Sequence, residues 1–312
     1  MNQTVLITGG SGLVGTALSH VLIQKGYTVI ILTRDISKKK SLKNIHYAMW
    51  DVKKQIIDID AIKKADFIVH LAGAGVVEKK WTDAYKKEIV ESRTCSSRLL
   101  VETLKNNPNK VKAVISSSAI GFYGKDAVNI VPFTETDNAD DSFLGQTCYQ
   151  WEESISPIIN LGKRLVILRT GIVLSNLRGA LTEFKKPLQF GMATILGSGR
   201  QKISWIHIDD LCSMYIAAIE NSNIDGVYNA VAPFPVSNKK LMLCLAKKMN
   251  GFLFIPIYVP SFALKLLMGQ RSIEVLKSTT VSCTKTMEAG FTFQYHQIEA
   301  ALENLVKTTN RH

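Results

Sequence analysis

The chain has 312 residues, with 38 lysines and arginines against 26 aspartates and glutamates, a net charge of +12 and 46% hydrophobic residues. This composition suits one large α/β domain, or one domain with a smaller lobe, and it excludes a disordered or fibrous chain. No apolar run approaches the roughly 18 residues that span a membrane, and the N-terminus MNQTVLITGG lacks the basic segment that opens a signal peptide.

Short apolar runs alternate with helical patterns along the first half of the chain. Because most of these runs show no polar alternation, they are predicted to be strands buried on both faces, as in a parallel sheet covered by helices. The predicted fold class is α/β, a doubly wound parallel sheet of Rossmann-like type. The expected strands are 5–9, 27–33, 45–51, 65–73, 112–118, 164–171 and 226–231, and the expected helices are 13–26, 81–106, 143–161 and 209–221.

The pattern loosens after residue 171. We expect a cofactor domain built from residues 1–171 and about 204–231, and a smaller, discontinuous C-terminal substrate lobe built from about 172–203 and 232–312. The apolar segment 252–271, FLFIPIYVPSFALKLLMGQR, is predicted to be core rather than a partner surface. Its two prolines argue against a membrane role.

The cysteines and lysines of the chain indicate its cellular compartment and its binding partners. The five cysteines are far apart and form no CxxC pair, which favours a reducing cytoplasm and argues against a disulfide framework or a metal site. The lysines are mostly scattered in pairs, with one run of three at 38–40, as on a solvated surface. A basic chain also suits a small anionic or polar ligand. Neither nucleic-acid nor membrane binding is expected, and the oligomeric state stays open.

A glycine loop follows the first predicted strand, in the segment TVLITGGSGLVGTAL. Gly9 allows a tight turn, Gly12 lets backbone amides approach a pyrophosphate, and Gly15 lets the following helix pack close to the strand. A glycine motif between a strand and an amphipathic helix is typical of a dinucleotide site. The second strand ends in LTRD, where Arg34 can pair with a 2′-phosphate, so NADP(H) is favoured over NAD(H).

Further motifs occur in a consistent order along essentially the whole chain. With the loop TGGSGLVG they carry a resemblance to the extended short-chain dehydrogenase/reductase superfamily, the NAD(P)-dependent epimerases and dehydratases. The chain most resembles an atypical "epimerase family" subgroup, which is sugar-nucleotide-epimerase-like and has a distinctive C-terminal domain. The motifs are HLAG (70–73), ESRTCSSRLL (91–100), SSSAIGFYG (116–124), CYQWEE (148–153), LRTGIVLS (168–175), SWIHIDDL (204–211) and EAGFTFQYHQIEAAL (288–302).

The resemblance implies roles for particular residues. Ser118 corresponds to the family's catalytic serine, and His207 and Asp209 look structural, with Asp209 as the expected N-cap of the helix that follows. The implied cofactor-binding residues are Gly9, Ser11, Gly12, Leu13, Val14 and Gly15 in the loop, Arg34 at the 2′-phosphate, and Leu71, Ala72 and Gly73 near the adenine and ribose.

The chain departs from the superfamily at its acid/base pair. A tyrosine followed four residues later by a lysine is expected there, because the ammonium lowers the tyrosine pKa. The stretch QTCYQWEES (146–154) offers instead Cys148 with Glu152, which the resemblance favours, or Tyr149 with Glu153. A carboxylate raises a neighbouring acid's pKa, so Glu152 does not replace the lysine electrostatically, although it could accept from the nicotinamide ribose.

Two functions remain open at this stage. One is an NADP-dependent oxidoreductase or epimerase-like enzyme acting on a polar, nucleotide-sugar-type small molecule. It would use Ser118 with an unusual proton donor such as Cys148, Tyr123 or water. The other is an NADP-binding sensor or regulatory protein with little or no turnover. The missing Tyr/Lys pair favours the sensor and the retained Ser118 favours the enzyme, towards which the sequence leans.

Overall fold

An eight-stranded sheet organises the first part of the chain, in the order β12-β7-β6-β5-β1-β2-β3-β4. The coordinates are those of a computed structural model that describes residues 3–37 and 44–309, so the predicted lysine run at 38–40 lies outside the described residues. The strands are β1 (Thr4–Thr8), β2 (Thr28–Thr33), β3 (Ile45–Asp51), β4 (Ile56–Ile57), β5 (Phe67–His70), β6 (Ala113–Ala119), β7 (Arg164–Thr170) and β12 (Gly226–Ala230).

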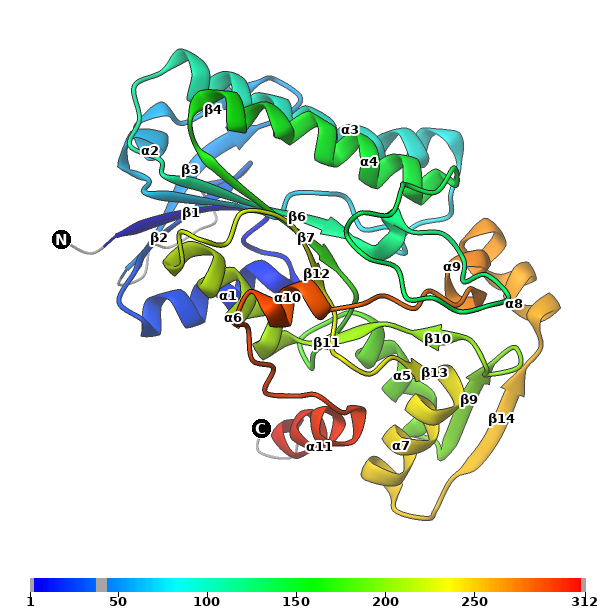
Figure 1. Ribbon diagram of the computed structural model, residues 1–312. Coiled ribbons are helices and arrows are strands. Elements are labelled where there is room, and N and C mark those ends of the chain that lie inside the picture. The colour runs from blue at the N-terminus through cyan, green and yellow to red at the C-terminus, as the bar shows by residue number, and fades with distance from the viewer. Residues whose placement is uncertain (1–2, 38–43, 310–312) are drawn as a thin grey trace.

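Every pairing in this sheet is parallel except that of the short β4, which runs antiparallel to β3. One face is covered by α2 (Ile59–Lys64), α3 (Asp83–Asn106) and α4 (Phe143–Ile155), and the other by α1 (Leu13–Gln24) and α6 (Ile208–Glu220) (Figure 1). Alternate strand residues enter two separate cores: Val5 and Ile7 pack on the α1 side, whereas Leu6 packs on the α3 side. The predicted doubly wound fold is confirmed.

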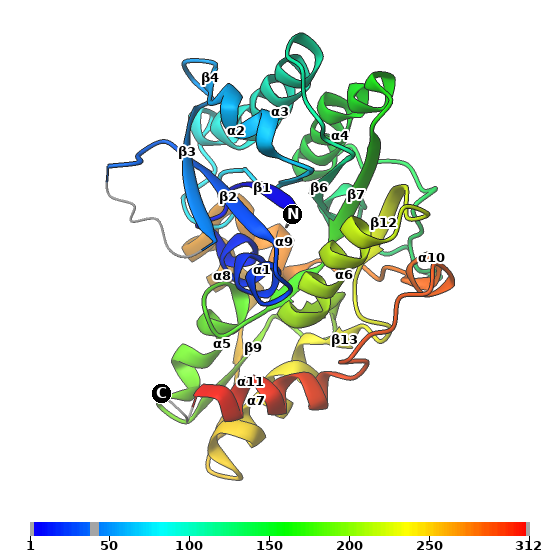
Figure 2. The same ribbon diagram turned by 90° about the vertical axis from the view of Figure 1, so that its left-hand side faces the viewer.

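A second lobe lies beyond α1 and α6 (Figure 2). Its own hydrophobic cluster surrounds Trp205 and draws on α5, α7, β9 and α11, so this cluster is separate from both sheet cores. The predicted domain boundaries remain a prediction. The remaining strands and helices of the chain are β8 (Ile172–Leu174), α5 (Ala180–Leu188), β9 (Met192–Leu196), β10 (Lys202–Ile203), β11 (Trp205–His207), β13 (Val236–Ser237), α7 (Asn238–Asn250), β14 (Ile255–Val259), α8 (Ser261–Met268), α9 (Ser272–Leu276), α10 (Thr284–Glu288) and α11 (Ile298–Thr309). Among the described residues, 3-10 turns occur at Ile120–Phe122, Ser156–Leu161 and Gly269–Arg271.

Two local predictions were wrong. The N-cap of α6 is His207, whose Nδ1 accepts from the Asp209 backbone N–H at 3.0 Å, so Asp209 lies in the first helical turn. The segment 252–271 is largely exposed rather than core; Leu264 is its one fully buried large apolar side chain. The segment stays exposed despite its apolar composition because β14 has only β9 beside it, so little packs against its side chains.

Across the described residues, no helix combines the length and the apolarity needed to traverse a bilayer.

Candidate active site

The sheet reverses its winding direction between β1 and β5. The chain runs outward from β1 through β2 and β3 on one side, and from β5 through β6 and β7 on the other. At such a point the connections leave the carboxyl ends of neighbouring strands in opposite directions and open a crevice, where open α/β sheets bind their ligands. Thr8 and His70, the last residues of the two strands, lie opposite each other at this point.

The glycine loop after β1 is packed so closely that side chains are excluded. Gly9 has φ +67°, and a Cβ there would lie 2.8 Å from the Leu71 carbonyl oxygen. A Cβ on Gly15 would lie 2.6 Å from Gly10 Cα and from the Gly9 carbonyl oxygen. The roles predicted for Gly9 and Gly15 agree with this packing. Gly10, which the sequence argument passed over, is equally constrained by the Ile31 side chain.

Gly12 differs because the space beside it is open. A Cβ there would meet only the Gly9 carbonyl oxygen, at 3.2 Å. Gly12 is the N-cap of α1, no side chain caps this helix, and its first turn holds no acidic residue. The first N–H groups of a helix have no partner within the helix and, with the helix dipole, favour an anion. The arrangement fits a dinucleotide pyrophosphate, which the backbone amides of Leu13, Val14 and Gly15 would hold, with Ser11 exposed beside them.

The end of β2 presents a cation beside this loop. Arg34 is exposed and, among the described residues, makes no ion pair. The neighbouring Asp35 is engaged locally, since its Oδ1 accepts from the Ser37 backbone N–H at 3.0 Å and from the Ser37 hydroxyl at 2.6 Å. The guanidinium is therefore the group available at this strand end for a phosphate on the adenosine ribose.

The segment after β5 is held by hydrogen bonds at both ends. Thr8 Oγ1 accepts from the backbone N–H groups of Leu71 and Ala72, each at 3.1 Å. Farther along, Arg93 Nη1 donates to the Ala74 carbonyl at 3.0 Å, and its guanidinium lies directly behind Gly73. Leu71, Ala72 and Gly73 thus form a fixed wall of the crevice, with Gly73 exposed.

His70 is a neutral imidazole that hydrogen-bonds to Thr8, the residue that holds this wall in place. Because Thr8 Oγ1 already accepts two N–H groups, its own proton points to His70 Nδ1, 2.8 Å away. The proton of the ring therefore lies on Nε2, which faces the hydroxyls of Ser97 at 3.2 Å and Ser96 at 3.3 Å. Burial lowers the pKa of His70 to about 3, which agrees with the neutral form.

Ser118 and Glu152 meet at the end of β6. The Ser118 hydroxyl donates to Glu152 Oε1 at 2.6 Å. Parallel register places Arg169 of β7 opposite Ser118, and this arginine forms a two-pronged ion pair with the same carboxylate, Nε to Oε1 at 2.9 Å and Nη2 to Oε2 at 2.8 Å. The two side chains of the ion pair are only 5% and 11% exposed. The carboxylate is thereby fixed in position and charge-balanced.

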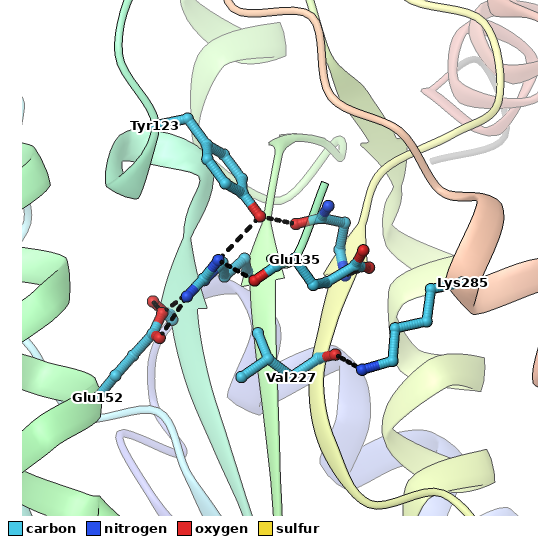
Figure 3. A network of polar contacts seen from close by, with 8 residues as sticks. Tyr123, Glu135, Glu152, Val227 and Lys285 are labelled. Carbon is cyan, nitrogen blue, oxygen red and sulfur yellow. Dashed lines mark hydrogen bonds and ion pairs between the residues drawn. The ribbon is translucent and has the colours of Figure 1, made fainter. Parts of the chain in front are cut away.

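Arg169 also connects this pair to a buried polar network (Figure 3). Its Nη1 donates to the Tyr123 hydroxyl oxygen at 3.0 Å and to the Glu135 carbonyl at 3.2 Å. Tyr123 in turn donates to Asn229 Oδ1 at 2.7 Å, and the Asn229 backbone N–H donates to the Glu135 carboxylate at 2.7 Å. All three nitrogens of the Arg169 guanidinium therefore donate hydrogen bonds. Burial lowers the pKa of Arg169, but the hydrogen bonds and charge of Glu152 outweigh it, so the net shift is upward.

The other proton donors considered from the sequence are poorly placed. Cys148 is buried one helical turn before Glu152, and burial raises the pKa of its thiol to about 11 despite the opposing charge of Arg93. Tyr123 is fully buried and stacked on Phe133, and burial raises its pKa to about 12. Both groups hold their protons at neutral pH. Tyr149 and Glu153 face outward from α4, so Cys148 and Glu152 form the inward pair.

Sequence reasoning missed Arg169, Asn229 and His70. A signal was present for Arg169, because a charged residue inside the otherwise apolar strand RLVILRT needs a buried partner. The partners of all three residues depend on the fold.

Comparisons with known proteins agree with this geometry. Residues 5–150 match the model of the NAD dependent epimerase/dehydratase family, and residues 259–305 match a domain of unknown function. An epimerase family protein of Staphylococcus aureus (strain NCTC 8325) is 35% identical over 309 residues, covering 97% of this chain and 98% of that protein. One from Staphylococcus saprophyticus is 36% identical over 304 residues, covering 96% and 98%.

Solved structures give the same relationship. The crystal structure of a human epimerase family protein with NADPH is 25% identical and superimposes with a TM-score of 0.83, over 98% of this chain and 99% of that one. A nucleoside-diphosphate sugar epimerase from Corynebacterium glutamicum is 32% identical with a TM-score of 0.76, over 98% of this chain and 58% of that chain.

Proposed function

Because the chain belongs to the epimerase family and is an enzyme of the NAD(P)-dependent epimerase or oxidoreductase type, we propose that it uses NADP(H) to act on a polar, nucleotide-sugar-type small molecule. We further propose that the Ser118–Glu152 pair carries the proton that a tyrosine carries elsewhere in the superfamily. The observation behind this proton route is the 2.6 Å hydrogen bond from Ser118 to a carboxylate that Arg169 fixes.

NADP(H) as the cofactor is supported by two features of the crevice. The uncapped α1 N-terminus beside Gly12 suits the pyrophosphate, and the exposed Arg34 suits a 2′-phosphate. The human relative that was crystallised with NADPH supports the same choice. When bound, the nicotinamide would supply hydride exchange with a carbon that bears a hydroxyl or carbonyl group.

The proton route follows from the direction of the Ser118 hydrogen bond. Since the Ser118 proton points to Glu152 Oε1, its oxygen lone pairs remain to accept a proton from a substrate hydroxyl. As that proton reaches Ser118 Oγ, the serine proton passes to Glu152, and the reverse transfer returns a proton to the carbonyl oxygen of a substrate whose carbonyl carbon takes up hydride. Arg169 keeps the carboxylate in position during both transfers. Arg169 is a positioning residue, because it acts through Glu152.

A nucleotide-sugar-type substrate is supported by the relatives. The Corynebacterium structure is described as a nucleoside-diphosphate sugar epimerase, and this chain is 32% identical to it. Hydroxyl-bearing sugar carbons are the groups on which paired proton and hydride transfer acts.

The cofactor proposal is tested by titrating the purified protein with NADPH and NADH. NADPH should bind more tightly, and Arg34→Ala should weaken NADPH binding by about tenfold or more while leaving NADH binding unchanged, because a charge-assisted phosphate contact is removed. Gly12→Val should weaken both nucleotides. Equal binding of both by the wild type would refute the NADP preference.

The proton route is tested by turnover of UDP-glucose, UDP-glucuronic acid and UDP-N-acetylglucosamine with bound NADP⁺. Glu152→Gln and Ser118→Ala should each lower kcat by about 10²- to 10⁴-fold with NADPH affinity unchanged. Cys148→Ala is the matched control from the same face of α4 and should retain the wild-type rate. Full activity of Glu152→Gln would refute the route, and loss of activity in Cys148→Ala alone would point to the thiol instead.

A further inference from the structure

A strip of large apolar side chains projects from the second lobe. The backbone N–H of Ile255 donates to the Gly191 carbonyl at 2.8 Å, which brings the turn at Phe190 beside the start of β14. β14 leads into α8 through Pro260 alone. Isolated exposed hydrophobic residues are ordinary, whereas a gathered set marks an interaction surface. We call the following seven residues, each between 69% and 85% exposed, the apolar strip: Phe190, Phe252, Leu253, Ile255, Phe262, Leu266 and Leu267.

The strip lies on an element that is open on both faces. β14 pairs only with β9, and four consecutive residues, 255–258, are exposed, so side chains on both faces of this two-stranded ribbon meet solvent. Figure 1 shows β14 at the outer side of the lobe, ascending to α8. The free edge carries Pro256, which has no N–H to donate. This edge is therefore a poor template for a strand from a second copy.

Most of the net charge of the protein lies in the two stretches of sequence that contain the strip. Residues 172–203 and 232–277 contain 12 lysines and arginines but only two acids, whereas the whole chain has a net charge of +12. Both acids are already paired, Glu183 with Lys186 at 2.7 Å and Glu274 with Lys277 at 2.9 Å. A surface of this charge repels its own copy and attracts an anionic one.

Individual lysines stand beside individual members of the strip. Lys247 Nζ lies 5.3 Å from the ring centre of Phe252, and Lys239 Nζ lies 5.9 Å from that of Tyr258, which is on β14 but outside the strip. Lys265 is exposed on α8 between Phe262 and Leu266. Within the described part of the chain, these three lysines have no carboxylate partner. By contrast, Lys240 and Lys248 pair with Glu299 and Glu303 of α11.

We infer that the apolar strip and its lysines dock the protein onto the surface of an anionic phospholipid bilayer. Apolar side chains would enter the interface between headgroups and acyl chains, and the lysines would contact the lipid phosphates. The prolines that argued from the sequence against a membrane role disfavour a spanning helix, and surface docking needs none. This inference is independent of the proposed function, since it uses none of the residues in the crevice.

The test is flotation of the full-length protein with vesicles of phosphatidylcholine alone and with vesicles that also contain phosphatidylglycerol. Binding should require phosphatidylglycerol and fall as salt is added, because the lysine contacts are screened. Phe252→Asp and Leu266→Asp should each weaken vesicle binding by about tenfold or more, since each removes a large apolar group from the interface. Ile159→Asp, at an exposed apolar position outside the strip, is the matched control and should bind as the wild type does.

NADPH binding and the circular dichroism of each variant establish that it is folded. The inference is overturned if the wild type fails to float with phosphatidylglycerol vesicles, or if it floats and both strip variants float equally well. It is also overturned if light scattering finds a wild-type dimer that Leu266→Asp dissociates, because the strip would then be an interface between two copies.

Discussion

Removing the Arg169 side chain should destabilise the protein far more than an ordinary surface substitution does. In Arg169→Met, Glu152 keeps its charge in a site where its side chain is 11% exposed, and it loses two hydrogen bonds of 2.9 and 2.8 Å. Each hydrogen bond to a charged group contributes about 1.5–3 kcal/mol, and breaking a buried pair from one side costs about 3–5 kcal/mol. The near-complete burial of both side chains leaves little screening by solvent, so we expect a loss of about 3–5 kcal/mol in the free energy of unfolding.

The assay is guanidinium denaturation followed by tryptophan fluorescence, with Arg169→Met, Glu152→Gln and the double variant measured in parallel. The double variant should be more stable than Arg169→Met by at least about 1 kcal/mol, because the unpaired charge is gone. A loss below about 1 kcal/mol in Arg169→Met, within the range of exposed pairs, would refute the reasoning. So would strictly additive effects of the two single substitutions.

Three further outcomes follow from the crevice. Gly15→Ala should lower the melting temperature and abolish the NADPH-induced thermal shift, because its Cβ would lie 2.6 Å from the backbone of Gly9 and Gly10; an unchanged shift would contradict the packing. Because burial lowers the folded-state pKa of His70 to about 3, the unfolded chain binds a proton that the folded chain does not, and stability falls as the pH drops below the unfolded pKa of about 6.5. Urea unfolding should show a loss of about 1.4 kcal/mol from this residue between about pH 7.5 and about pH 5.5, and His70→Gln should remove that part of the slope. Cys148, whose thiol pKa burial raises to about 11, should be alkylated by iodoacetamide more slowly than the half-buried Cys95 and Cys244, as peptide mass spectrometry can measure; faster labelling of Cys148 would contradict its burial.

Local pattern sufficed for the sheet and the glycine loop. The strands of the main sheet could be predicted because a parallel strand is buried on both faces. Such a strand therefore shows an unbroken run of apolar residues in the sequence. Gly9, Gly12 and Gly15 could also be recognised from the sequence, because a tight turn followed by the first turn of a helix sets their spacing. Ser118 and Glu152 were found individually, through the resemblance to a known family.

Tertiary structure decided how those residues are joined. Arg169 lies 17 residues from Glu152, and only the parallel register of β6 with β7 and the packing of α4 bring Ser118, Glu152 and Arg169 together. The same holds for the segment 252–271, whose apolar composition predicted core. Burial depends on what packs against a segment. The side chains of this segment are exposed because β14 has a neighbouring strand on one edge only and α8 is covered on one side only. The sequence by itself determined the main elements and the glycine loop, whereas the grouping of Ser118, Glu152 and Arg169 and the apolar strip exist only in the folded chain.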